Sequence, residues 1–232
     1  MICRRTYKLL GELMERAHKI YPKIGLKWEG HPKNQWRAPS GATIRFLSFQ
    51  RKKDADDYVG AEIQFLGIDQ AEQFTWEIVE MLESCVRSTD ARIPTRVRYT
   101  SNPGGIGHGW FKKMFCDACR PIAIGKPVYL PQFKITYQPI VPGKAYTKNG
   151  QTYQFIPSRV FDNPHIIQND PKYVWKLIAL PEQLRKAYLF GSYDAFVGQF
   201  FRDWDYDTNV CEPFAIPPIW NVYGAFDWGY KH

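Results

Sequence analysis

The spacing of apolar residues predicts an α/β fold for the first two-thirds of the chain. Between Lys8 and Tyr21 apolar side chains recur at helical spacing, which predicts an amphipathic helix packed on a sheet; they are Leu9, Leu10, Leu13, Met14, Ala17 and Ile20. Short strand-like runs at 27–29, 34–38 and 43–49 are broken by proline and glycine. We expect them to be antiparallel strands at one edge of the sheet. Residues 126–154, rich in Pro, Tyr and Gly, predict loops with short strands.

Further helices are predicted on either side of that loop-rich region. One helical stretch runs over 75–87. Asp170-Pro171 opens another helix, since proline is favoured in a first turn, and Pro181 starts a third. Trp76 and Trp175 fall within helical patterns, where packing in the core is the expected role.

One strand-like segment ends in an acidic residue. Five of the seven residues in 63–69 are apolar and the last is Asp69, which predicts a buried strand ending at the carboxyl edge of the sheet, where α/β folds bind ligands. Mg²⁺ takes one or two protein carboxylates, and phosphates and water complete its shell. Asp69 therefore suits a magnesium ligand. The alternative is a carboxylate that only caps a helix.

A second strand-like segment, 96–99, ends in the small polar residues Thr100, Ser101 and Asn102. A glycine-rich turn follows and leads into a helix. If the two strands are neighbours, Asp69 lies beside Ser101 and Asn102. A hydroxyl or an amide at this place can sense a γ-phosphate or the water that attacks it.

At these two places the chain resembles the large terminase subunit of tailed bacteriophages, the motor that packages DNA into a procapsid. In that family an apolar strand ending in Asp-Glu is the Walker B motif, and a Thr/Ser-Ser-Asn-Pro-Gly-Gly run is the coupling motif that links hydrolysis to movement. The resemblance extends over nearly the whole chain. Other similar segments are 41–46 before Walker B, 161–164 after the ATPase core, 181–193 and 198–201 in the linker, and 217–220 and 225–229 at the start of the nuclease.

The resemblance implies a domain order. Residues 1–163 would form an ATPase core, a partial P-loop-type (ASCE) sheet with flanking helices. Residues 164–215 would form a small helical linker subdomain, and 216–232 the first strand of a ribonuclease-H-like nuclease. The implied activities are ATP hydrolysis that drives double-stranded DNA into procapsids, and Mg-dependent cleavage of the DNA concatemer.

The resemblance also implies roles for single residues. Asp69 would hold Mg²⁺ and contact ATP, and Gln70 and Glu72 would orient the attacking water. Ser101 and Asn102 would couple hydrolysis to movement, with Asn102 also contacting the nucleotide.

The implied nuclease and partners follow from the same likeness. Asp227 would be the first ligand of the nuclease metal, Mg²⁺ or Mn²⁺. The partners would be double-stranded DNA, the portal protein and the small terminase subunit, with the full-length parent assembled as a homo-oligomeric ring on the procapsid.

The phosphate-binding loop of this family does not occur in the sequence. Gly125-Lys126 and Gly143-Lys144 lack both the upstream glycine and the following Ser/Thr of Gly-x-x-x-x-Gly-Lys-Ser/Thr. Residues 2–7 resemble the family strand that follows the P-loop helix, and the sequence stops soon after Asp227. We therefore expect an internal segment of a terminase, from a partial gene, a split gene or a decayed prophage.

Gln70 departs from the family pattern, in which Glu follows the Walker B Asp and polarises the attacking water. An amide can orient water but cannot accept its proton, and general-base help typically contributes about 10²–10⁴-fold. Glu72 can substitute if the turn directs its side chain inward. The alternative is a solvated residue at a helix N-terminus, favoured there by the helix dipole.

The net charge of the sequence indicates a class of ligand. The 31 Lys and Arg against 23 Asp and Glu give a formal net charge of +8, which favours a polyanion such as duplex DNA. The basic residues cluster at Arg4/Arg5, Arg51-Lys52-Lys53, Arg92/Arg96/Arg98 and Lys112/Lys113. The alternative for each cluster is a solvated face.

The sequence shows no apolar run of about 18 residues and no signal-peptide pattern at its start. We expect a soluble protein of the bacterial host cytoplasm with no membrane partner.

The cysteines and His108 carry weaker signals. Five scattered cysteines without a secretion signal predict free thiols. Cys116 and Cys119 have zinc-knuckle spacing, but no second pair completes four ligands, so a structural role is expected. His108 could touch phosphate, although an ordinary surface role is the simpler expectation.

Two hypotheses remain open. The first is a segment of an ATP-driven DNA translocase. The second is a catalytically inactive prophage remnant or DNA-binding module that keeps the fold and the basic surface. The missing Gly-Lys-Ser/Thr loop favours the second for this polypeptide, and the order of the motifs favours the first for its parent.

Overall fold

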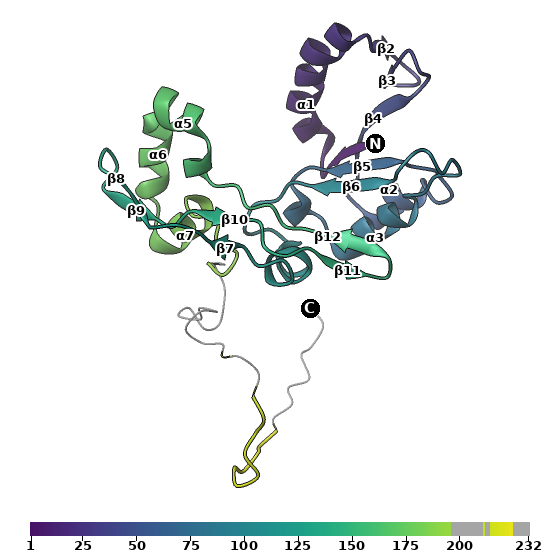
Figure 1. Ribbon diagram of the computed structural model, residues 1–232. Coiled ribbons are helices and arrows are strands. Elements are labelled where there is room, and N and C mark those ends of the chain that lie inside the picture. Colours follow the sequence, from purple (N-terminus) through teal and green to yellow (C-terminus); the bar gives the residue numbers. More distant parts are fainter. Residues whose placement is uncertain (196–210, 212–213, 225–232) are drawn as a thin grey trace. The chain divides into compact units, whose positions relative to one another are not determined.

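The computed structural model describes residues 1–195, 211 and 214–224 (Figure 1). The chain divides into two compact units, residues 1–198 and 199–232. The helices, strands and candidate site below all belong to the first unit. The segments predicted at 198–201 and 225–229, which include Asp227, lie outside the described residues.

A six-stranded sheet is the framework of the first unit, in the order β2-β3-β4-β1-β5-β6. The pairs β4–β1, β1–β5 and β5–β6 are parallel, whereas β2–β3 and β3–β4 are antiparallel. The strands are β1 (Ile2–Arg4), β2 (Lys27–Glu29), β3 (Gln35–Arg37), β4 (Thr43–Ser48), β5 (Phe65–Ile68) and β6 (Arg96–Tyr99). The fold is thus mixed α/β with a mostly parallel central sheet.

The predicted antiparallel edge is confirmed for β2 and β3 but is wrong for β4. Strand β4 pairs antiparallel with β3 on one side and parallel with β1 on the other. Its neighbouring residues Phe46 and Leu47 pack into two different hydrophobic clusters. A strand with apolar contacts on both faces belongs inside a sheet rather than at its edge.

The alternation of side chains along the strands separates the two faces of the sheet. On one face Ile2 and Phe46 pack with Leu10 and Ala17 of α1 (Tyr7–Ile20). On the other face Cys3 and Leu47 join a cluster that includes α3 (Trp76–Ser84). Figure 1 shows α1 and α3 on opposite sides of the strands. The predicted helices at 8–21 and 75–87 are therefore confirmed.

The remaining elements lie between the strands of the sheet or after them in sequence. The other helices are α2 (Lys52–Asp56), α4 (His108–Phe111), α5 (Pro164–Asn169), α6 (Pro171–Ile178) and α7 (Glu182–Tyr188). Short helical turns are η1 (Tyr21–Ile24), η2 (Ala71–Gln73), η3 (Lys112–Asp117) and η4 (Val160–Asp162). Two-stranded ribbons pair β7 (Ile122–Ala123) with β10 (Ile140–Val141), β8 (Val128–Leu130) with β9 (Ile135–Tyr137), and β11 (Tyr146–Lys148) with β12 (Gln151–Tyr153).

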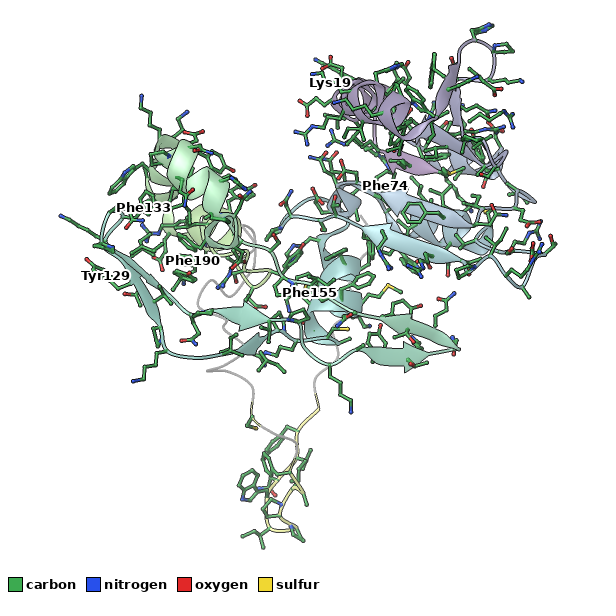
Figure 2. The ribbon with its side chains drawn as sticks, turned by 45° about the horizontal axis from the view of Figure 1, so that its top comes forward. Lys19, Phe74, Tyr129, Phe133, Phe155 and Phe190 are labelled. Atoms are coloured by element: carbon green, nitrogen blue, oxygen red, sulfur yellow. The ribbon has the colours of Figure 1, made fainter. Side chains whose placement is uncertain are left out.

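A separate hydrophobic cluster joins the β8–β9 ribbon to helices α5 and α6 and to the residues just after α7. Phe133 from the ribbon is buried with Val174 and Leu177 of α6 and with Leu189. Figure 2 shows Phe133 and Phe190 at these helices, whereas Phe74 lies with the sheet. The domain boundary expected at 163 stays a prediction.

The helix starts predicted at Asp170-Pro171 and Pro181 are confirmed. The Asp170 side chain accepts a hydrogen bond from Tyr173 N–H at 3.2 Å, which caps α6. The core position expected for Trp175 is wrong, because this side chain is 46% exposed, and its ring contacts the edge of the core at Phe133. No helix in the described ranges combines the length and apolar character needed to cross a membrane.

Candidate functional site

The carboxyl ends of β5 and β6 bring Asp69 to Thr100. The parallel register pairs Ile68 with Tyr99, so the residues that follow lie opposite one another. The Thr100 hydroxyl donates to Asp69 Oδ1 and accepts the Gln70 N–H at 3.0 Å. The prediction that Asp69 sits at this edge is confirmed, but its direct neighbour is Thr100 rather than Ser101 or Asn102.

Arg4 is the second partner of Asp69. Strand β1 is parallel to β5, and Asp69 N–H donates to the Cys3 carbonyl at 2.9 Å. This register places the Arg4 guanidinium against Asp69, where Nε donates to Oδ2, while Nη1 donates to the Leu9 carbonyl at 2.6 Å. The Arg4 side chain is 12% exposed and is therefore no part of a basic surface.

Gln70 turns the chain sharply after Asp69. Its φ is +58°, in the left-handed region, and it caps the short helical turn η2. Its side-chain oxygen accepts a hydrogen bond from Gln73 Nε2 at 3.1 Å. The amide of Gln70 thus has a protein partner on its own turn.

The same sharp turn directs Glu72 inward. Glu72 is 6% exposed, and its Oε2 accepts the Asn102 N–H at 3.1 Å. Burial raises the pKa of Glu72, while hydrogen bonds from the Asn102 N–H and the Ser101 hydroxyl act in the opposite direction. The alternative of a solvated Glu72 at a helix N-terminus is wrong, because the left-handed Gln70 rotates this side chain beneath the loop after β6.

Two glycines make this close approach possible. Gly105 has φ +75°, and a Cβ built there would overlap the Glu72 carbonyl oxygen. At Gly107 a Cβ would overlap the Phe74 carbonyl oxygen, and Gly107 N–H donates to Glu72 O at 2.7 Å. The glycine-rich loop therefore closes directly onto η2.

His108 closes the far end of the loop. Its Nδ1 accepts the Gly104 N–H at 2.9 Å, and its ring stacks on Tyr193 with centroids 5.5 Å apart. Tyr193 also stacks on Phe111 at 5.5 Å. Because His108 is only 8% exposed, the expected surface role is wrong. Burial lowers the pKa of His108, in keeping with an Nδ1 that accepts a hydrogen bond.

The residues of the site thus form two neighbouring pairs. Asp69 faces Thr100, and Glu72 faces Asn102 with Ser101 beside it. Neither Thr100 as the partner of Asp69 nor the role of Arg4 was predicted from the sequence. The available signal was the position of Arg4 at the end of a strand-like run, which we assigned to a basic cluster instead.

The oxygen donors at this edge fit a magnesium ion. Mg²⁺ prefers hard oxygen ligands and commonly uses one or two carboxylates, and Asp69 with the Thr100 hydroxyl offers such donors on one side of the strand ends. Within the described part of the chain, no group of three or more His, Cys, Asp and Glu converges as a metal cluster. A magnesium ion at this edge would therefore need further ligands besides Asp69, such as phosphate and water.

Cys116 and Cys119 lie away from this edge and are buried free thiols. Cys119 Sγ donates to the Tyr153 carbonyl at 3.4 Å. Burial raises the pKa of the Cys116 thiol, which disfavours the thiolate that a metal requires.

Comparison with known proteins identifies a shared fold. No protein-family model matches the chain, and no curated protein matches it by sequence. The large terminase of a thermophilic bacteriophage is similar in structure, with a TM-score of 0.53 at 12% identity in one crystal form. In another crystal form of the same terminase, in complex with ADP, the TM-score is 0.55 at 13% identity.

Each of these likenesses covers 83% of this chain and 40% of the thermophilic phage protein. The chain thus has a terminase-like fold over most of its length, and it spans well under half of the solved terminase.

Proposed function

We propose that the chain is a segment of a large terminase subunit, which uses ATP hydrolysis to package double-stranded DNA into procapsids and cleaves the DNA concatemer. The observation that carries the proposal is the contact of Glu72 with Asn102 N–H at 3.1 Å, one turn beyond the contact of Asp69 with Thr100. It joins the acidic strand end to the loop that resembles the coupling motif. The terminase-like fold supports the same assignment.

In this proposal Asp69 holds the magnesium ion of ATP and Thr100 fixes the orientation of its carboxylate. A bound magnesium ion would neutralise charge on the phosphates. Glu72 serves as the general base, because a carboxylate whose pKa is raised by burial is better matched to accept a proton near neutral pH. Gln70, whose side chain accepts a hydrogen bond from Gln73, provides the sharp turn between Asp69 and Glu72.

Ser101 and Asn102 would transmit the state of this site. A shift of the Glu72 carboxylate changes its bond to Asn102 N–H, and the loop from there to His108 is closed on η2. The loop ends at the stack of His108 on Tyr193, which follows α7. DNA, the portal protein and the small terminase subunit would be partners of the full-length ring, and Asp227 a nuclease ligand for Mg²⁺ or Mn²⁺.

A second candidate function is a DNA-binding remnant without catalysis. One observation favours it: Gln70 stands where the family has Glu. The remnant would keep the fold and bind duplex DNA through its exposed arginines and lysines.

Phosphate-release assays distinguish the two candidates. A longer gene product that contains these residues and a phosphate-binding loop should hydrolyse ATP, and Asp69→Asn should abolish the activity. The 232-residue chain itself should release no phosphate above background, since it lacks the lysine and backbone amides that cradle phosphates. A longer product that binds ATP but does not hydrolyse it would support the remnant. Turnover that persists in Asp69→Asn would refute the assigned site.

A further inference from the structure

The negative charge of the Asp69 carboxylate is already compensated by Arg4. Oδ1 accepts from the Thr100 hydroxyl, and Oδ2 accepts from Arg4 Nε. The Arg4–Asp69 pair is net neutral, and both side chains are largely buried, at 12% and 20% exposure. A carboxylate that binds a divalent cation by itself would normally keep its negative charge uncompensated.

The backbone fixes Arg4 in this position. Arg4 ends β1, and β1 is hydrogen-bonded in parallel register to β5, which carries Asp69. Arg4 Nη1 is further tied to the Leu9 carbonyl at the start of α1. The guanidinium is therefore part of the sheet edge and not a long side chain that reaches Asp69 from a distance.

We propose that Arg4 is a positioning residue that prevents free divalent cations from binding to Asp69. This inference rests on the proposed role of Asp69 as a ligand of nucleotide-bound magnesium. The positive charge of Arg4 repels a bare cation a few ångströms away, and the repulsion is strong where solvent screening is weak. A cation that arrives on a polyphosphate brings negative charge with it and is repelled less. Arg4 thus favours the complexed over the free ion.

Titration with Mn²⁺, followed by the electron paramagnetic resonance of the free ion, tests this on the chain as it exists. Arg4→Gln should bind free Mn²⁺ about tenfold more tightly than the wild type, because removing one nearby positive charge leaves Asp69 uncompensated. The gain should disappear in the double variant Arg4→Gln/Asp69→Asn. Arg4→Lys keeps the charge and should bind as weakly as the wild type.

Arg92→Gln is the matched control. Arg92 pairs with Asp90 at 2.7 Å, outside the site, and is 88% exposed. Its removal changes the net charge equally, but the Arg92–Asp90 pair is more exposed and its charges are screened by solvent, so Mn²⁺ binding should stay nearly unchanged. Equal gains in Arg92→Gln and Arg4→Gln would mean a general charge effect and would overturn the proposal, as would no gain in Arg4→Gln.

If circular dichroism shows that Arg4→Gln does not fold, a comparison of Asp69→Asn with the wild type tests the proposal instead. Asp69→Asn should then change Mn²⁺ affinity of the wild-type background by less than about twofold, because Arg4 already compensates the carboxylate. A larger loss overturns the inference.

The experiment distinguishes a failure of the Arg4 inference from a failure of the proposed function. If Arg4→Gln gains nothing while ATP turnover of the longer product depends on Asp69, the inference about Arg4 alone is wrong. If the gain in Arg4→Gln persists without Asp69, the magnesium assignment itself is wrong.

Discussion

The carboxylate of Glu72 accepts the backbone N–H of Asn102 at 3.1 Å, across 30 residues of sequence. This bond ties the turn after the acidic strand to the glycine-rich loop after the next strand. It leaves Glu72 almost fully buried without an arginine or lysine partner among its hydrogen bonds in the described structure. The pKa of Glu72 and the effects of substituting this residue are therefore the most informative quantities to measure.

The stability of the chain should reveal the protonation of Glu72. Burial raises the pKa of Glu72 above its ordinary value of 4.5, so the folded chain binds this proton more tightly than the unfolded chain. The contribution of Glu72 is undiminished below pH 4.5, falls as the pH rises through the window between 4.5 and the raised pKa, and stays low above it. Glu72→Gln removes this loss and keeps an acceptor for Asn102 N–H.

The free energy of unfolding of Glu72→Gln minus that of the wild type should thus increase from about pH 4 to about pH 7. Urea unfolding at several pH values measures this difference. Glu62→Gln is the control of opposite sign, because hydrogen bonds led by Thr89 N–H lower the pKa of Glu62. If the difference between Glu72→Gln and the wild type does not change with pH, burial does not raise the pKa of Glu72.

Catalysis should depend on Glu72 more than on Gln70. In a longer product with a phosphate-binding loop, we expect Glu72→Gln to lower ATP turnover by about 10²–10⁴-fold, the range for loss of a positioned base. Gln70→Glu should change little, because the Gln70 side chain is engaged by Gln73. Nucleotide affinity must be measured for both variants, so that a change in binding is not mistaken for a change in chemistry.

A large rise in turnover for Gln70→Glu, with Glu72→Gln unchanged, would reverse the two assignments. Flat rates across both variants, with nucleotide bound and Asp69→Asn inactive, would mean that neither residue is the base.

The loop itself should tolerate no side chain at Gly105. Gly105→Ala places a Cβ onto the Glu72 carbonyl oxygen at φ +75°, and we expect a loss of about 2–4 kcal/mol in unfolding free energy. Gly104→Ala is the matched control: its φ is +109° but a Cβ there meets nothing within 4 Å. It should lose about 1–2 kcal/mol, from backbone strain alone. Equal losses by thermal or urea unfolding would show that the Gly105–Glu72 contact is not close.

Duplex DNA should bind weakly and without sequence preference through exposed basic residues. Arg96 and Arg98 project from one face of β6 and are exposed, whereas Lys112 is 21% exposed and pairs with Asp117 and Asp194. Replacing both arginines with glutamine should reduce the slope of log affinity against log salt by about two.

Lys112→Gln should leave the DNA affinity unchanged. Fluorescence anisotropy with a labelled duplex at several NaCl concentrations measures both effects. Binding that is insensitive to salt, or equally weakened by Lys112→Gln, would mean that β6 is no DNA-binding surface.

The sequence by itself determined which segments become strands and helices and where the acidic strand ends. Local periodicity is sufficient for this, because apolar residues recur at helical spacing over 7–20 and form a short run before Asp69. The glycine-rich loop after β6 was also evident, since glycine is the residue type that best accommodates the positive φ of Gly104 and Gly105. The placement of Ser101 and Asn102 near the acidic turn followed from the parallel arrangement of two strands.

Only the tertiary structure decided which partners these residues meet. The β5–β6 register selects Thr100 for Asp69, and a shift of one residue would bring Tyr99 or Ser101 opposite Asp69 instead. The β1–β5 pairing brings Arg4, 65 residues away in sequence, onto Asp69. Burial of Glu72 depends on the left-handed turn at Gln70 and on the glycine opposite. Such contacts are set by strand order and register, which a local pattern of residues does not encode.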